Sequence, residues 1–134
     1  MKILIVEDEV ASRKFLNRVM ESYGDCDCAA DGNEAIGMFK EALESGNGYD
    51  LICMDIMMPE MNGIEALEGI RELERGHGVE FRKEVRVIMT TALDDPVNVV
   101  DAYYRGGASV YLTKPVDISD IRNAMIELGF LKKN

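Results

Sequence analysis

Residues 51–63, LICMDIMMPEMNG, join an apolar run to a lone carboxylate, a proline and a glycine. The run Leu51–Met54 is apolar at consecutive positions, which is typical of a strand buried on both faces of a sheet. Asp55 ends this run, and Pro59 and Gly63 mark a turn. Beyond the turn, apolar residues recur at helical spacing, at Ile64, Leu67, Ile70 and Leu73. A buried strand, a turn and an amphipathic helix form the unit of a parallel α/β sheet.

The same unit recurs along the chain on both sides of this stretch. Further strands are predicted at Ile3–Val6, Val85–Met89 and Val110–Leu112, with a weaker edge strand at Cys26–Ala30. Apolar helical faces follow them, at Phe15–Met20, Ala35–Leu43, Ile118–Leu128 and, more weakly, Val97–Tyr104. Because each strand precedes a helix, we predict an α/β fold with a five-stranded, parallel, doubly wound sheet of order 2-1-3-4-5 and helices on both faces.

Turn residues agree with these boundaries. Asp31-Gly32 precedes the second helix, Gly46-Asn47-Gly48 ends it, and Gly106-Gly107 ends the fourth. The polar segment Arg75–Glu84 is expected to be an exposed loop. The Lys114-Pro115 bond is a candidate cis peptide, because only an X-Pro bond tolerates that form at low cost.

Composition limits the class of protein. The chain has 134 residues, 47% of them hydrophobic, which suits one globular domain. Its 25 acidic and 15 basic residues give a net charge of −10, which disfavours direct binding to nucleic acid. No apolar run is long enough for a signal peptide or membrane insertion, so a cytoplasmic location is expected. Cys26, Cys28 and Cys53 have no zinc-site spacing and are expected to be reduced thiols.

Polar residues follow the apolar runs where the carboxyl ends of parallel strands meet. Glu7 and Asp8 follow the first run and Asp55 the third, while Thr91 and Lys114 follow the last two. Carboxylates gathered there repel one another by about 4 kcal/mol per close pair at an effective dielectric near 20. Hard oxygen ligands of this kind suit Mg²⁺. With a lysine ammonium and a threonine hydroxyl beside the ion, the edge becomes a site for a tetrahedral dianion.

These motifs, taken in order, resemble the receiver domain of two-component response regulators. The resemblance rests on Glu7-Asp8, the stretch 55–63, Thr91-Ala92, and Tyr111 ahead of Lys114-Pro115, and it covers essentially the whole chain. It implies a flavodoxin-like, CheY-like three-layer sandwich. It also implies a single receiver domain over residues 1–134 with no output domain, similar to the stand-alone chemotaxis type.

The resemblance implies a role for each acidic residue. Asp55 accepts a phosphoryl group from a sensor histidine kinase, with Mg²⁺ held by Asp8, Asp55 and the backbone carbonyl of Met57. Glu7, which stands where the family more often has Asp, acts through a metal-bound water. Lys114 contacts the phosphoryl oxygens. This is nucleophilic catalysis by a carboxylate, confined to the protein's own phosphorylation and dephosphorylation, so the chain is not expected to be an enzyme in the ordinary sense.

The resemblance also implies a switch. Thr91 hydrogen-bonds to the arriving phosphoryl group, and Thr91 and Tyr111 relay the change to a surface made of the fourth helix, the fifth strand and the fifth helix. That surface binds a downstream target, for which the flagellar motor switch is one candidate. A phosphatase is a further candidate partner.

Four alternatives remain open at this point. A phosphorelay intermediate uses the same chemistry in another pathway. A Mg²⁺-dependent aspartyl phosphohydrolase of the haloacid dehalogenase type needs a second Asp two residues after the nucleophile, and position 57 is Met. A flavin or nucleotide carrier needs a phosphate loop after the first strand, where Glu7-Asp8-Glu9 repels phosphate. The fourth alternative is a receiver-like module that binds partners without being phosphorylated. Such a module does not need the acidic residues Glu7, Asp8 and Asp55, so their presence argues against it.

Overall fold

Five parallel strands form one sheet in the computed structural model, which describes residues 1–92 and 107–133. The strand order is β2-β1-β3-β4-β5, as predicted from the alternation of strands and helices. The strands are β1 (Lys2–Val6), β2 (Asp25–Ala29), β3 (Leu51–Asp55), β4 (Arg86–Thr91) and β5 (Val110–Thr113). The predicted fourth helix, Val97–Tyr104, lies outside the described residues.

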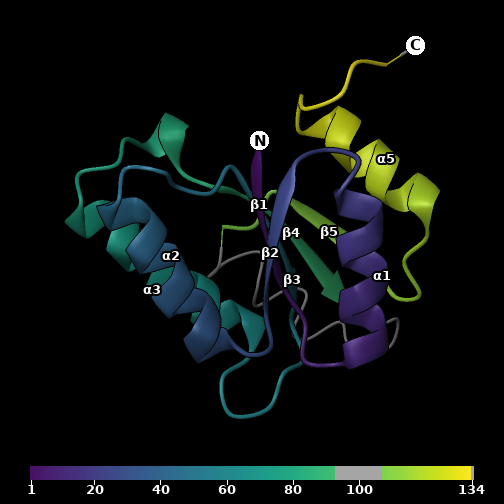
Figure 1. The fold of residues 1–134 in the computed structure, drawn as a ribbon, viewed down its shortest axis with the longest axis horizontal. Helices are drawn as coiled ribbons and strands as arrows, with labels where there is room; N and C mark the ends of the chain where they lie inside the picture. The colour runs from purple at the N-terminus through teal and green to yellow at the C-terminus, as the bar shows by residue number, and fades with distance from the viewer. Residues whose placement is uncertain (93–106, 134) are drawn as a thin grey trace.

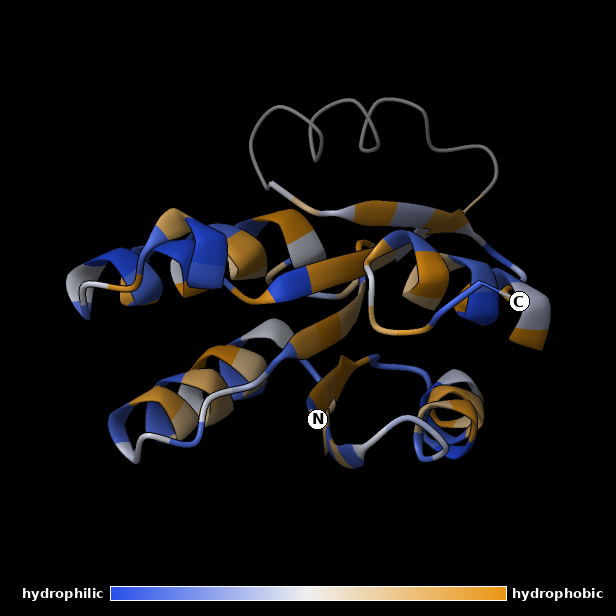
Figure 2. Cartoon of the chain, turned by 90° about the horizontal axis from the view of Figure 1, so that it is seen from above, coloured by the Kyte–Doolittle hydropathy of each residue, from blue (hydrophilic) through white to orange (hydrophobic). Residues whose placement is uncertain are grey.

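Helices cover both faces of this sheet and make a three-layer α/β sandwich (Figure 1). Helices α2 (Gly32–Glu44) and α3 (Gly63–Gly76) lie on one face, and α1 (Val10–Met20) and α5 (Ile118–Glu127) lie on the other. In β1 the side chains alternate between the two cores, with Leu4 packing toward α2 and α3 and Ile5 toward α1 and α5. This explains why the central strands are apolar at every position. In Figure 2 the hydrophobic colour accordingly dominates the central strands, and the helices are striped.

Reciprocal capping boxes fix where two of these helices begin. Asn62 accepts from the backbone N–H of Glu65 while the Glu65 carboxylate accepts from the N–H of Asn62, a reciprocal capping box. Asp117 and Asp120 make the same arrangement at the start of α5. The helix that follows β3 therefore starts at a fixed position, immediately after the loop that leaves Asp55.

Several predicted boundaries were wrong. Strand β2 begins and ends one residue earlier than the predicted Cys26–Ala30. Strand β4 begins one residue later than expected and extends through Thr90 and Thr91, which pair in register with Asp55 and Thr113. The prediction ended this strand just before the two threonines. In the structure both threonines are buried, and their backbones still pair with the neighbouring strands. Within the segment expected to be a loop, α3 continues to Gly76 and a short 3₁₀ helix, η1 (Phe81–Lys83), follows.

The cysteines are free thiols, as expected. Burial raises the pKa of Cys26 to about 11 and that of Cys53 to about 12, so both thiols stay protonated at neutral pH. Burial likewise raises the pKa of Cys28. Protonated thiols are poor nucleophiles and poor metal ligands. Among the described residues, no helix combines the length and the hydropathy that a membrane span requires.

Candidate functional site

The predicted acidic residues come together at the carboxyl end of the sheet. Glu7 follows β1 directly, and Asp55 is the last residue of β3. One carboxylate oxygen from each of Glu7, Asp8 and Asp55 lies within 4.8 Å of the others. This confirms that the two strand ends bring three carboxylates to one point.

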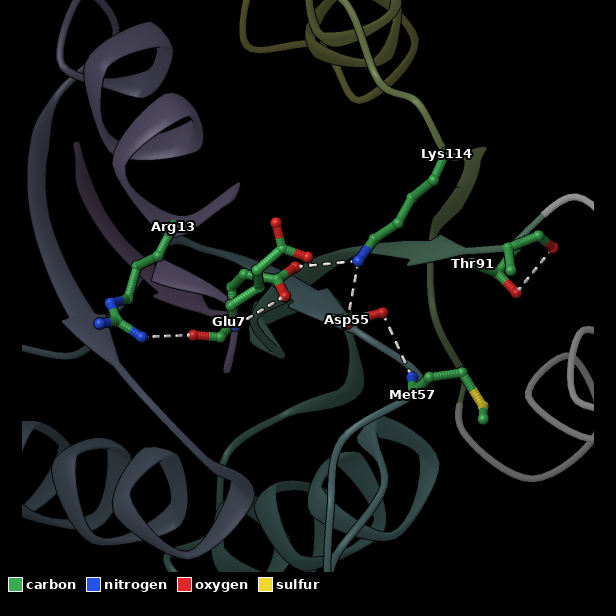
Figure 3. Close-up of polar contacts among 8 residues, drawn as sticks. Glu7, Arg13, Asp55, Met57, Thr91 and Lys114 are labelled. Atoms are coloured by element: carbon green, nitrogen blue, oxygen red, sulfur yellow. Dashed lines mark hydrogen bonds and ion pairs between the residues drawn. The ribbon is translucent and has the colours of Figure 1, made fainter. Parts of the chain in front are cut away.

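Lys114 reaches into this cluster from the end of β5. Its ammonium Nζ lies 3.0 Å from Asp55 Oδ2 and 3.2 Å from Glu7 Oε2. Figure 3 draws both contacts as dashed lines. The backbone N–H of Lys114 donates to the carbonyl oxygen of Thr91 at 2.7 Å, which fixes the start of the lysine side chain at the strand edge. The Lys114-Pro115 bond is cis, as the sequence suggested it could be.

The carboxylates at this edge are poorly compensated. Glu7 is 0% exposed and Asp55 only 4%. Burial, and then the negative charge of Asp55, raise the pKa of Glu7 to about 7, although the N–H of Glu9 and the ammonium of Lys114 act in the opposite direction. Burial would lower the pKa of Lys114, but its contacts with Asp55 and Glu7 outweigh this and raise it. Lys114 thus contacts two of the three carboxylates in the cluster, and three carboxylates against one ammonium leave an excess of negative charge.

The loop after β3 holds Asp55 by close backbone contacts. Gly63 donates its N–H to the carbonyl of Ile56 at 2.8 Å, and a Cβ at Gly63 would collide with the carbonyl oxygen of Asp55. Only glycine permits this approach. The N–H of Met57 donates to Asp55 Oδ1 at 3.2 Å, so the Met57 main chain lies beside the carboxylate while its side chain is 54% exposed. Both oxygens of Asp55 therefore have a donor.

The predicted switch residues lie apart from this cluster. Thr91 ends β4 and is 3% exposed, and its hydroxyl donates to the carbonyl of Ala92 at 3.5 Å. Within residues 1–92 and 107–133, no hydrogen bond joins this hydroxyl to the three carboxylates or to Lys114 (Figure 3). Tyr111 on β5 is half-buried and packs against the α2/α3 core. The structure thus groups the acids and the lysine, but not the threonine hydroxyl.

Sequence reasoning missed two residues of this region. Arg13 on α1 donates from Nη1 to the carbonyl oxygen of Glu7 at 2.9 Å and so supports the strand end (Figure 3). The buried Thr90 helps to line a cavity of about 510 Å³ that opens between α1 and the Lys114-Pro115 turn, with Phe15 and Val116 on its walls. The local sequence offered no signal for Arg13, because its partner is a backbone carbonyl six residues earlier. Thr90 precedes Thr91, which was predicted as a site residue, but no sequence motif pointed to Thr90 itself.

Comparison with known proteins identifies the family. A family model described as the response regulator receiver domain matches residues 3–126, and the chain belongs to that family. It is thus a receiver domain of two-component signalling.

Curated relatives carry this domain in different settings. The chain is 34% identical over 118 residues to the chemotaxis protein CheY of Treponema pallidum, covering 87% of this chain and 74% of that protein. It is 34% identical over 131 residues to the hybrid signal transduction histidine kinase B of Dictyostelium discoideum, where the match covers 94% of this chain and 6% of the kinase. The chain thus spans only a small part of that relative's length.

Solved structures agree with the fold. A CheX–CheY complex with BeF₃ and Mg²⁺ from Borrelia burgdorferi matches with a TM-score of 0.77 at 34% identity, over 98% of this chain and 90% of that one. A co-crystal structure of the Saccharomyces cerevisiae phosphotransfer protein Ypd1 with the receiver domain of Ssk1 matches with a TM-score of 0.81 at 29% identity, over 99% and 93% of the two chains.

Proposed function

We propose that Asp55 is the phosphoacceptor of a signalling switch, and that its donor is the phosphohistidine of a sensor histidine kinase or of a phosphotransfer protein. The observation that supports this most is the contact between Asp55 and Lys114 inside a carboxylate cluster with excess negative charge. A purely structural cluster would be expected to balance its charges. This one leaves room for a cation and for an incoming anion that the lysine can hold.

Mg²⁺ fits the donors at this edge. Asp8, Asp55 and the backbone carbonyl of Met57 would hold the ion, and the buried Glu7 would act through a metal-bound water. When bound, the ion would supply positive charge that offsets the carboxylates and the phosphoryl oxygens. Burial, and then the charge of Asp55, raise the pKa of Glu7, and a cation bound beside Glu7 would oppose both effects.

The transfer itself needs only groups already positioned. A carboxylate oxygen of Asp55 attacks phosphorus, the new O–P bond forms as the P–N bond to imidazole breaks, and the electron pair leaves with the ring nitrogen. Lys114, freed from one carboxylate, follows the negative charge onto the phosphoryl oxygens. The N–H of Met57 holds the other carboxylate oxygen and orients the nucleophile. The chain thus promotes its own phosphorylation and dephosphorylation and acts on no separate substrate.

In this proposal Thr91 carries the signal away from Asp55 by changing its hydrogen-bond partner. Its hydroxyl now contacts Ala92, and a phosphoryl group on Asp55 would favour the state in which it turns toward the new oxygens. That movement opens space which the Tyr111 ring can fill, changing the surface of β5, α5 and the predicted fourth helix. A charge-assisted hydrogen bond of about 1.5–3 kcal/mol would change the population ratio by roughly one to two powers of ten. Thr91→Ala should still accept phosphate but transmit less of the change, measured as amide shifts over β5 and α5.

For the pathway we propose chemotaxis, with a target such as the flagellar motor switch and a phosphatase that resets Asp55. The likeness to CheY proteins supports this. A phosphorelay intermediate is the second candidate, favoured by the likeness to a receiver domain bound to a phosphotransfer protein. The aspartyl phosphohydrolase is disfavoured because Met57 supplies no acid. The cytoplasmic location stays a prediction.

Incubation with Mg²⁺ and acetyl phosphate tests the proposal, with the intact mass as readout. The parent and a matched control, Asp25→Asn at an exposed position on β2, should each gain the mass of one phosphoryl group. Asp55→Asn should gain none. Full labelling of Asp55→Asn, or no labelling of the parent in the presence of Mg²⁺, would overturn the assignment.

A further inference from the structure

We propose that the end of the sheet opposite Asp55 is a docking surface for an acidic segment of a partner protein that carries one large apolar side chain. The surface consists of Phe81, Arg82 and Lys83 on η1 together with Arg86 at the start of β4, and is called the basic pole below. It takes no part in the phosphoryl chemistry proposed above, so the inference goes beyond that function.

An exposed aromatic ring marks the basic pole. Phe81 is 87% exposed, by far the most exposed of the large apolar side chains among the described residues. Beside it lies a cavity of about 520 Å³, lined by Phe81, Arg82, Val85, Arg86, Gly107 and Ser109, among others. Arg86 is the first residue of β4 and Thr91 the last, so the length of a strand separates this cavity from the acidic cluster. Figure 1 shows η1 at the end of the molecule where the strands begin.

The charge at the basic pole is opposite to that of the chain as a whole. The net charge is −10, yet three cationic side chains stand close together on and next to η1. Within the described residues, no ion pair or hydrogen bond engages the side chains of Arg82, Lys83 or Arg86. One half-buried carboxylate, Glu84, also lines the cavity. A second carboxylate, the exposed Glu80, precedes Phe81 as the N-cap residue of η1. With three cations against these two carboxylates, and no ion pair to the cations within residues 1–92 and 107–133, the surface presents positive charge beside an apolar ring, and an acidic ligand would complement it.

The floor of the cavity is held rigidly. Glu74 accepts from the N–H of Val85 at 2.7 Å and from Arg71 at 2.8 Å, and Arg71 also donates to the carbonyl oxygens of Val85 and Gly107. This network ties α3 to the start of β4 and to the residues before β5. A ligand that binds here meets a preformed surface, so little ordering of the protein opposes binding.

The overall charge selects the kind of occupant. DNA and an anionic membrane are extended polyanions, and the 25 acidic residues of the chain would repel them around so small a basic area. A short acidic segment can contact the arginines without meeting the rest of the surface. Its apolar side chain would pack between Phe81 and Val85. Because the basic pole lies away from Asp55, docking should be independent of the phosphorylation state.

A synthetic peptide, Asp-Glu-Asp-Phe-Glu-Asp-Glu, tests the proposal by titration into the full chain with amide shifts as readout. Shifts should concentrate on residues 79–87 and 107–110 and should be the same with and without Mg²⁺ and BeF₃⁻. The charge variant Arg82→Glu/Arg86→Glu and the ring variant Phe81→Ser should each weaken binding by about tenfold or more, a free energy of at least 1.4 kcal/mol. The control Lys40→Glu/Arg122→Glu changes the net charge equally at exposed positions elsewhere and should bind as the parent does.

Several outcomes would overturn the proposal. These are equal binding by the parent and the charge variant, shifts centred on the acidic cluster, or no loss when the peptide's Phe becomes Ser. Tighter binding to anionic vesicles or duplex DNA than to the peptide would assign the surface to a polyanion instead. No saturable binding of the peptide at millimolar concentration would also contradict it. Labelling of the same variants by acetyl phosphate should be unchanged, which separates a failure here from a failure of the Asp55 assignment.

Discussion

Glu7 at the carboxyl end of the sheet and Glu74 near its amino end are both buried carboxylates, 0% and 2% exposed. Glu74 has a donor of its own on each oxygen, the guanidinium of Arg71 and the N–H of Val85. Glu7 accepts from the N–H of Glu9 at 3.2 Å, but the one cation that it contacts, Lys114 at 3.2 Å, is shared with Asp55, and burial raises the pKa of Glu7 to about 7. Glu74 is thus paired with one cation, whereas at the other end three carboxylates gather around a single ammonium. The comparison teaches that a buried charge indicates function where its compensation is incomplete, rather than where it is merely buried.

Removing the cation at each end should separate catalysis from stability. Lys114→Met should slow labelling by acetyl phosphate by about 10²–10³-fold, because the phosphoryl oxygens lose a positioned positive charge. Arg71→Met should leave the labelling rate of the folded protein nearly unchanged but lower the free energy of unfolding by about 3–5 kcal/mol, since Glu74 is left buried without its partner. Rate measurements and urea unfolding of both variants check this. An equal loss of labelling rate in Lys114→Met and Arg71→Met would contradict the distinction between the two ends of the sheet.

Removing a carboxylate from the cluster should weaken divalent binding. Asp8→Ala leaves Asp55 and the Met57 carbonyl as protein ligands, so the affinity for Mg²⁺ should fall by about tenfold or more, or 1.4 kcal/mol. Calorimetric titration with Mg²⁺ measures it. Asp25→Ala, which also removes one exposed acidic side chain, is the control and should bind Mg²⁺ as the parent does. An unchanged affinity in Asp8→Ala would show that the metal assignment is wrong.

The two buried glutamates should respond oppositely to neutralisation. The folded pKa of Glu7 is raised, so this residue favours folding below its unfolded pKa near 4.5, and that advantage is lost as pH rises to about 7. In the metal-free protein above pH 7, Glu7→Gln should therefore raise the free energy of unfolding by about 1–3 kcal/mol. Glu74→Gln should lower it across the same range, because it weakens satisfied contacts.

Denaturant unfolding of both variants at pH 5 and pH 8, without divalent ions, makes this measurement. Mg²⁺ should then stabilise the parent more than Glu7→Gln, with the larger difference at pH 8. A parent whose stability rises between pH 5 and pH 8 relative to Glu7→Gln would contradict the account of this end.

Two glycines provide the smallest and most local test. A Cβ at Gly63 would meet the backbone of Asp55 and Ile56, whereas a Cβ at Gly69 on α3 would meet the movable Ile36 Cδ1 at 2.9 Å. Gly63→Ala should cost about 1–3 kcal/mol and slow labelling of Asp55, because the backbone must shift. Gly69→Ala should change stability by less, since better helix propensity, about 1 kcal/mol, offsets the contact. Thermal unfolding measures the stability of both variants. A larger loss of stability in Gly69→Ala than in Gly63→Ala would show that the loop after β3 is not tightly constrained.

The sheet was predictable because buried parallel strands leave long apolar runs. Strand order and the meeting of Glu7, Asp8, Asp55 and Lys114 followed from chain alternation and from where each run stops. The features that were missed depend on distant partners. Glu74 reads as a polar helix residue until Val85 and Arg71 are placed beside it, and its contacts hold the last turn of α3 next to the start of β4. The capping pattern Asn62 to Glu65 was readable in the sequence and was overlooked.

Localisation of the phosphoryl group tests the central claim most directly. The protein is labelled with acetyl phosphate and Mg²⁺, the acyl phosphate is reduced with borohydride to a stable homoserine, and the modified residue is found by peptide sequencing in the mass spectrometer. The account predicts homoserine at position 55, with none when Mg²⁺ is chelated before labelling. Modification at position 7 or 8, or an unmodified position 55 in fully labelled protein, would contradict it.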